Sequence, residues 1–196
     1  VSRREFIQSS AAAAAALAAT SSAFSATAAA RSPNERIRLG FIGVGERAQA
    51  HLDSVIRLHQ EGQAVEVAAI CDVFNRYRRE SAEKVRAAIK QTPKEIADYR
   101  DILSDPTIDA VCISTPDHWH ARQTVEALAA GKHVYCEKPM THSVDEALEV
   151  LKAWKQSGLV MQVGVQSTEV PAWHDANRRI CEGKLGKVLQ YQTEFF

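Results

Sequence analysis

Short apolar runs alternate with longer amphipathic stretches along most of this chain. The runs cover residues 37–42, 65–71, 110–114 and 160–165, together with the stretch from Gly131 to Glu137. Continuous apolar runs of this length are typical of strands buried on both faces of a parallel sheet. The alternation predicts an α/β fold, namely a Rossmann-type doubly wound parallel sheet with right-handed crossovers.

The stretches between the runs have helical spacing. In the first of them, one helical face carries Ala48, Leu52, Val55, Ile56 and His59. A later helix begins at a capping box, in which Ser143 is followed three residues on by Glu146. We expect the core-facing side of this later helix to consist of Val144, Ala147, Leu148, Leu151 and Trp154.

The last segment has a different pattern. A helix is predicted at residues 172–182, and residues 187–196 then alternate, with Leu189, Tyr191 and Phe195 on one side. Such alternation is typical of a half-buried strand in an antiparallel sheet. Residues 37–167 are therefore expected to form the Rossmann-type domain, and residues 168–196 the start of a second, α+β domain that is cut off.

The N-terminal segment has the layout of an export signal. Arg3 and Arg4 precede a stretch rich in Ala, Ser and Thr that runs to Ala30. This layout indicates a twin-arginine signal peptide at residues 1–30 and a linker at 31–36, and hence a periplasmic or secreted protein. The alternatives are a disordered Ala-rich tail or an Ala-rich helix of the fold. Ala and Ser are too weakly apolar for a stable membrane span.

Charge and cysteine content restrict the possible partners. Lys and Arg together number 24, as do Asp and Glu, so the formal net charge is zero and nothing favours a nucleic-acid partner. The four cysteines lack metal-ligand spacing, and buried free thiols are a better interpretation than a disulfide. His118 and His120 are expected to point to different helix faces or to the turn, so we expect no metal site.

A glycine-rich turn follows the first predicted strand. Gly43-Val44-Gly45-Glu46-Arg47-Ala48 fits G-x-G-x-x-A and opens a helix, an arrangement that lets a pyrophosphate approach the backbone. Asp72 ends the next strand, where a carboxylate can accept hydrogen bonds from ribose hydroxyls. This pairing predicts a dinucleotide site that favours NAD, although the nearby Arg76 leaves NADP open.

Two further strand ends carry polar groups. Ser114-Thr115-Pro116 form a turn across which a dinucleotide can lie, with His120 beside the cofactor or acting only as a helix cap. The other strand ends on Glu137-Lys138-Pro139. Lys138 is a candidate acid/base, because oxidation of an alcohol by nicotinamide requires removal of the hydroxyl proton. Partial burial and a positive nicotinamide would both favour its neutral form. The alternative is a surface ion pair at a strand end.

Taken in order, these motifs resemble the Gfo/Idh/MocA oxidoreductases, a family that includes glucose–fructose oxidoreductase and inositol dehydrogenases. The resemblance covers residues 37–196 and is most specific at Glu137-Lys138-Pro139. It implies an NAD(P)-binding Rossmann domain and a second domain with an open sheet, which often mediates homo-oligomer formation. It also implies a role for each candidate residue: pyrophosphate binding for Gly43, Gly45, Glu46 and Arg47; adenosine ribose binding for Asp72; the dinucleotide path for Ser114, Thr115, Pro116 and His120; the nicotinamide end for Glu137 and the catalytic Lys138; and the cofactor amide or ribose for Gln166.

The resemblance favours one function and leaves two others open. The first is hydride transfer between nicotinamide and a sugar, cyclitol or similar polyol. The second is an NAD-dependent glycosidase similar to α-N-acetylgalactosaminidases, and the third is a dinucleotide-binding module without activity. Ala48 replaces the more usual third glycine, and the family's further catalytic Asp and His are expected beyond Phe196.

Overall fold

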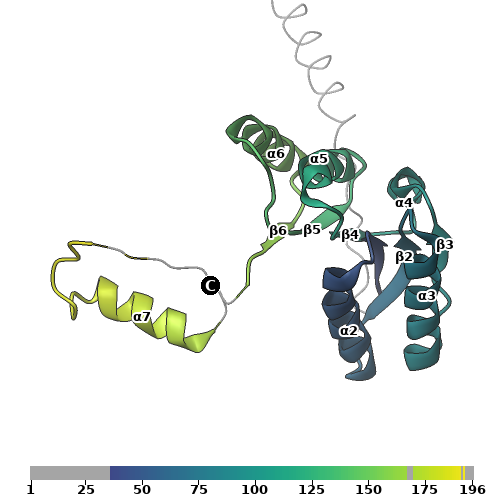
Figure 1. Ribbon diagram of the computed structural model, residues 1–196, viewed down its shortest axis with the longest axis horizontal. Helices are drawn as coiled ribbons and strands as arrows, with labels where there is room; N and C mark the ends of the chain where they lie inside the picture. The colour runs from purple at the N-terminus through teal and green to yellow at the C-terminus, as the bar shows by residue number, and fades with distance from the viewer. Residues whose placement is uncertain (1–35, 167–169, 191, 193–196) are drawn as a thin grey trace, which may run out of the picture. The chain divides into compact units, whose positions relative to one another are not determined.

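The computed structural model describes residues 36–166, 170–190 and 192 (Figure 1). The predicted signal peptide at 1–30 lies outside the described residues, as do 31–35 of the predicted linker. The predicted boundary between residues 167 and 168 also falls outside them and stays a prediction.

A six-stranded parallel sheet, in the order β3-β2-β1-β4-β5-β6, confirms the predicted fold class (Figure 1). Its strands are β1 (Ile37–Ile42), β2 (Val65–Cys71), β3 (Lys94–Ile96), β4 (Ala110–Ile113), β5 (His133–Glu137) and β6 (Met161–Gly164). The order reverses between β1 and β4, which makes their junction the topological switch point of the sheet. The three-residue β3 was not predicted, because Lys94 and Glu95 interrupt any apolar run.

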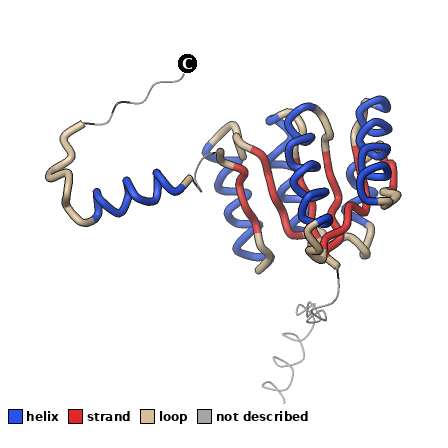
Figure 2. Tube along the Cα trace, turned by 90° about the horizontal axis from the view of Figure 1, so that it is seen from below, coloured by secondary structure: helices blue, strands red, loops and turns tan. Residues whose placement is uncertain are grey.

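Helices connect the strands, as Figure 2 shows in blue. They are α2 (Glu46–Gln60), α3 (Asn75–Ile89), α4 (Tyr99–Ser104), the 3-10 turn η1 (Asp117–Trp119), α5 (His120–Ala129), α6 (Val144–Ser157) and α7 (Pro171–Cys181). The predicted cap of α6 is present, since the Ser143 hydroxyl accepts a hydrogen bond from the Glu146 N–H at 3.2 Å. Gly158 ends the helix with φ +66°, a left-handed conformation that glycine adopts without strain.

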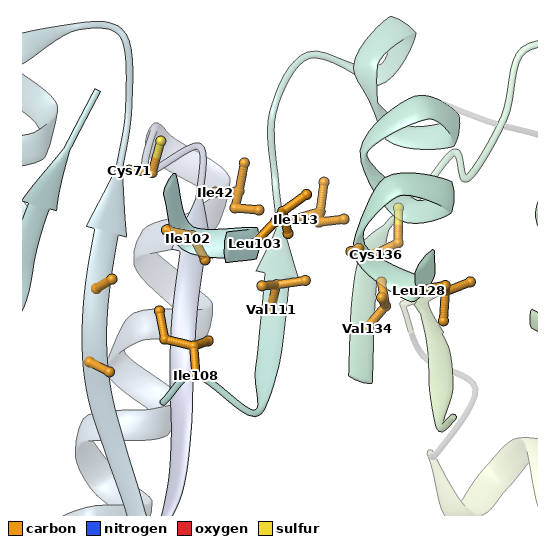
Figure 3. Packing of buried hydrophobic residues seen from close by; sticks show 13 residues of the cluster. Ile42, Cys71, Ile102, Leu103, Ile108, Val111, Ile113, Leu128, Val134 and Cys136 are labelled. Carbon is orange, nitrogen blue, oxygen red and sulfur yellow. The ribbon is translucent and has the colours of Figure 1, made fainter. Parts of the chain in front are cut away.

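Two apolar cores lie on opposite faces of the sheet. Phe41 and Ile42 enter different cores, because successive side chains of a strand point to opposite faces. Leu52 of α2 packs in the core that contains Phe41. Figure 3 shows the other core, where Leu103 of α4 and Leu128 of α5 cluster with strand residues. Burial on both faces explains why the strands are continuously apolar.

The predicted apolar face of α6 was wrong. Val150 is the buried residue of this helix, whereas Val144, Leu148, Leu151 and Trp154 are exposed. The partly buried Ala153 packs against the same core as β5. Ala147 of the predicted face is partly buried, but the large apolar side chains of α6 face outward, contrary to the expected orientation.

The strand predicted at residues 187–196 is not observed in the described part of that segment. Residues 187–190 contain no strand and are exposed. An isolated strand has no ladder of backbone hydrogen bonds to hold it, and no described residues pair with this segment. Residues 191 and 193–196 lie outside the described residues.

Candidate functional site

The predicted site residues meet at one edge of the sheet, because the carboxyl ends of parallel strands lie together. Gly43 follows β1, Asp72 follows β2, Ser114 follows β4, Glu137 ends β5 and Gln166 lies two residues after β6. In an open α/β sheet this edge, at the switch point between β1 and β4, is where ligands bind. The fold therefore brings the separate sequence motifs together.

The glycine-rich turn directly contacts the turn after β4. Gly43 has φ +79°, and a Cβ atom added there would lie 2.7 Å from the Thr115 backbone nitrogen and 2.9 Å from the Ser114 carbonyl oxygen. Only glycine fits this conformation and this close approach. By contrast, a Cβ at Gly45 would meet only Tyr77, at 4.0 Å. The space over Gly45 is thus open to a ligand.

Helix α2 begins at this open space. Its N-cap residue, Gly45, has no side chain to cap the first turn. The first N–H groups of a helix have no partner within the helix, and the helix dipole favours negative charge there. A pyrophosphate fits this position.

Asp72 supports the glycine-rich turn. Its Oδ2 accepts a hydrogen bond from the Val44 N–H and its Oδ1 accepts one from the Phe74 N–H, both at 2.8 Å. Each carboxylate oxygen can accept a further hydrogen bond, so these contacts leave capacity for ribose hydroxyls. The nearby Arg76 pairs with Glu80 at 2.7 Å.

Glu137 is a buried carboxylate, 3% exposed, at the end of β5. Its Oε1 accepts hydrogen bonds from Arg47 Nε at 2.8 Å and His51 Nε2 at 2.7 Å. Its Oε2 accepts one from the Lys138 N–H at 3.0 Å. Burial alone raises the pKa of Glu137, but the bonds from Arg47 and His51 outweigh it, and the pKa lies below its ordinary value. Glu137 is therefore an ionised anchor.

His51 is a site residue that the sequence reasoning missed. It lies on α2 four residues after Arg47, so both side chains project from the same helical face. Its ring also packs edge-on against Tyr135, with ring centroids 5.0 Å apart. The i, i+4 spacing of Arg47 and His51 after the glycine-rich turn was the available signal.

The two lysines around β5 have opposite environments. Lys132 is 5% exposed, and its Nζ donates hydrogen bonds to the carbonyl oxygens of Asp105 at 2.6 Å and Ile108 at 2.9 Å. Lys138 is exposed, so the described residues do not provide the partial burial expected for it. The first lysine serves the fold, whereas the second is accessible at the ligand-binding edge.

Hydrogen bonds with residues of α5 hold the turn after β4 in place. The Thr115 hydroxyl donates to Gln123 Oε1 at 2.7 Å, and Pro116 is the N-cap residue of η1. His120 is 2% exposed, and both ring nitrogens lie within hydrogen-bond distance of backbone carbonyl oxygens, those of Thr115 and Pro139. Its contact with a cofactor stays a prediction, as do the contacts expected of the exposed Gln166.

The cysteines of the described residues are free thiols; Cys71, Cys112 and Cys136 are buried, as expected, whereas Cys181 is exposed. Burial raises the pKa of Cys71 and of Cys112 to about 12, so neither is a nucleophile at neutral pH. Within the described residues, no three His, Cys, Asp or Glu side chains are grouped to hold a metal ion. The helices of this part of the chain also include none long and apolar enough to cross a membrane.

Fold and site together define an α/β protein with a dinucleotide-type glycine-rich turn at its switch point. The family model described as "Oxidoreductase family, NAD-binding Rossmann fold" (GFO_IDH_MocA) matches residues 37–165. The chain belongs to this oxidoreductase family.

Individual relatives agree with the family. The chain is 33% identical over 152 residues to the uncharacterized oxidoreductase YrbE of Bacillus subtilis, covering 78% of this chain and 42% of that protein. It is 34% identical over 170 residues to a glycosyl hydrolase family 109 protein of Shewanella baltica, covering 77% of this chain and 36% of that protein. The chain thus spans about two fifths of the length of these relatives.

A solved structure shares the fold. The WlbA dehydrogenase of Bordetella pertussis, in complex with NADH and UDP-GlcNAcA, has a TM-score of 0.65 and 27% identity to this chain. The match covers 78% of this chain and 44% of that one.

Proposed function

We propose that this chain forms the cofactor-binding part of an NAD(P)-dependent oxidoreductase acting on a sugar, cyclitol or similar polyol. One observation carries the proposal: Lys138 is exposed at the same sheet edge as the glycine-rich turn, beside the buried, anchored Glu137. The relative in complex with NADH and a nucleotide sugar supports both the cofactor and the substrate class.

Each of this chain's groups has a distinct task in the proposed reaction. The first turn of α2 binds the pyrophosphate, and Asp72 receives the adenosine ribose, which favours NAD over NADP. When bound, the nicotinamide supplies the site that accepts or returns a hydride. Lys138 takes the proton from the substrate hydroxyl during oxidation and returns it during reduction. Glu137 stays ionised and fixes the backbone of Lys138 by accepting a hydrogen bond from the Lys138 N–H.

Replacement of Lys138 tests the proposal. In the full-length protein, Lys138→Ala should lower kcat by about 10²–10⁴-fold, the usual contribution of a general acid or base. Calorimetry should give an NAD affinity within about threefold of the wild type, because Lys138 makes no contact that holds the glycine-rich turn. Lys152→Ala, at an exposed position of α6, is the matched control. Wild-type turnover in the Lys138→Ala protein would exclude the proposed role.

A glycosidase is the second candidate, favoured by the similarity to a glycosyl hydrolase family 109 protein. In this case the same lysine would serve a transient oxidation, and no net redox change would accumulate. Release of nitrophenol from a nitrophenyl N-acetylgalactosaminide without added cofactor supports the glycosidase. Steady NADH formation from a free sugar or polyol supports the dehydrogenase. NAD binding with neither activity would leave the third candidate, a binding module.

Two proposals concern the protein as a whole. The paired Arg3 and Arg4 support export by the twin-arginine route to the periplasm or the medium. Cell fractionation tests this directly, since Arg3→Lys combined with Arg4→Lys should retain the protein in the cytoplasm. The family resemblance supports a homo-oligomer, which light scattering of the full-length protein would reveal.

A further inference from the structure

His120 occupies an unusual position in the site. It is the first residue of α5 and is 2% exposed. Its Nδ1 lies 2.7 Å from the Pro139 carbonyl oxygen and its Nε2 lies 2.9 Å from the Thr115 carbonyl oxygen. Both ring nitrogens therefore face groups that can only accept hydrogen bonds.

A helix-capping role explains only half of this geometry. The bond to Thr115 spans five residues and belongs to the start of α5. The bond to Pro139 spans 19 residues and connects the turn after β4 to the segment after β5. Because a carbonyl oxygen only accepts, the bond to Pro139 is donated by the ring Nδ1–H. A local cap would not need the second bond.

The two residues that His120 connects follow neighbouring strands, β4 and β5, at the same ligand-binding edge. Thr115 belongs to the turn that contacts Gly43, and Pro139 directly follows Lys138. On the other side of Lys138, the Glu137 side chain is held from α2. Lys138 is thus an exposed residue between two neighbours that are each fixed by a separate helix.

We propose that His120 is a positioning residue that fixes the Lys138–Pro139 segment against the Thr115 turn. Through this connection His120 holds the lysine backbone in place relative to the cofactor-binding turns. The consequence for turnover rests on the proposed function, since it assumes that Lys138 transfers the proton. The connection itself does not depend on that assumption.

Two measurements on the full-length protein test the proposal together. In His120→Leu, hydrogen exchange of the Lys138 amide, which donates to Glu137 Oε2, should accelerate by about tenfold or more. The kcat should fall by about 10–100-fold, with KM and NAD affinity within about threefold of the wild type. His120→Gln, which keeps one donor group, serves as the second variant if the leucine protein does not fold.

His59→Leu is the matched control. It removes a comparable contact, between His59 Nδ1 and the Val65 carbonyl oxygen at 2.9 Å, that lies at the start of β2 away from the site. This variant should lose stability with unchanged kcat and unchanged exchange of the Lys138 amide.

The possible outcomes separate the proposal from the proposed function. Unchanged exchange of the Lys138 amide in both His120 variants would overturn the connection. Faster exchange with wild-type kcat would overturn the positioning role and leave His120 as a structural residue. A wild-type protein without dehydrogenase or glycosidase turnover would contradict the proposed function, while the exchange result would still decide the connection.

Discussion

Removal of the Glu137 carboxylate should destabilise this protein far more than removal of an exposed carboxylate. Glu137→Ala deletes the acceptor of three hydrogen bonds, from Arg47 Nε at 2.8 Å, His51 Nε2 at 2.7 Å and the Lys138 N–H at 3.0 Å. The carboxylate is 3% exposed and His51 is 16% exposed, so water can replace few of the lost hydrogen bonds.

The size of the effect follows from burial. Removing one partner of a buried charged pair costs about 3–5 kcal/mol. Arg47 is 43% exposed and regains water, which places the expected loss near the lower end, at about 3 kcal/mol. For a chain of this size the melting temperature should fall by about 6–12 °C.

An exposed ion pair of similar geometry provides the control. Arg76 Nε lies 2.7 Å from Glu80 Oε1, but these side chains are 71% and 57% exposed. Glu80→Ala should therefore lower the melting temperature far less than Glu137→Ala, because exposed pairs one helical turn apart contribute little to stability. Urea and thermal unfolding of both variants give the comparison. Equal losses of stability in the two variants would refute the argument that burial makes the Glu137 contacts strongly stabilising.

The pH dependence of the same anchor has a definite sign. The pKa of Glu137 is depressed in the folded protein, so its contribution to stability is fully present above the ordinary carboxyl pKa of about 4.3. That contribution is lost as the pH falls from this value through the folded pKa. The stability difference between wild type and Glu137→Gln should shrink below about pH 4. A difference that stays constant down to pH 3 would contradict the depressed pKa.

Three further outcomes test other parts of the structure. Gly43→Ala should abolish NAD binding in calorimetry, because a Cβ atom at φ +79° meets backbone atoms at 2.7–2.9 Å; retained affinity would contradict this geometry. Val150→Ala should cost about 1.5–3 kcal/mol in urea unfolding, while Leu148→Ala should stay within about 0.5 kcal/mol; the opposite order would restore the helix face predicted from sequence. In the native protein, Ellman's reagent should modify the exposed Cys181 quickly and the buried Cys71 only after unfolding, and equal rates would contradict the described burial.

Much of the fold could be predicted because burial on two faces leaves a direct trace in sequence. The continuous apolar runs predicted five of the six strands, and the glycine-rich turn identified the switch point. The orientation of α6 could not be predicted in this way. Both sides of this helix carry apolar residues, and the small Ala153 and Val150 face the core while the larger Leu148 faces outward. A count of apolar positions predicts that the face with the larger side chains is the buried one.

The candidate site was predictable in its location but not in its connections. The placement of Asp72 and Lys138 at one edge of the sheet could be predicted because each follows a strand, while their roles stay proposals. The bonds of His51 to Glu137 and of His120 to Pro139 depend on the packing of separate helices against the sheet. A single sequence carries no direct record of such contacts.

The pairing of Arg47 with Glu137 also bears on how the site is assembled. The two residues are 90 positions apart, so Arg47 of α2 cannot form this bond until β5 has been synthesised and added to the sheet. Contacts between residues this far apart in sequence carry the entropic cost of closing a long loop, which makes them slow to form. We therefore expect the dinucleotide site to be one of the last parts of the domain to mature, after the sheet itself. A nascent chain that has been synthesised only as far as its glycine-rich turn would not yet bind its cofactor tightly.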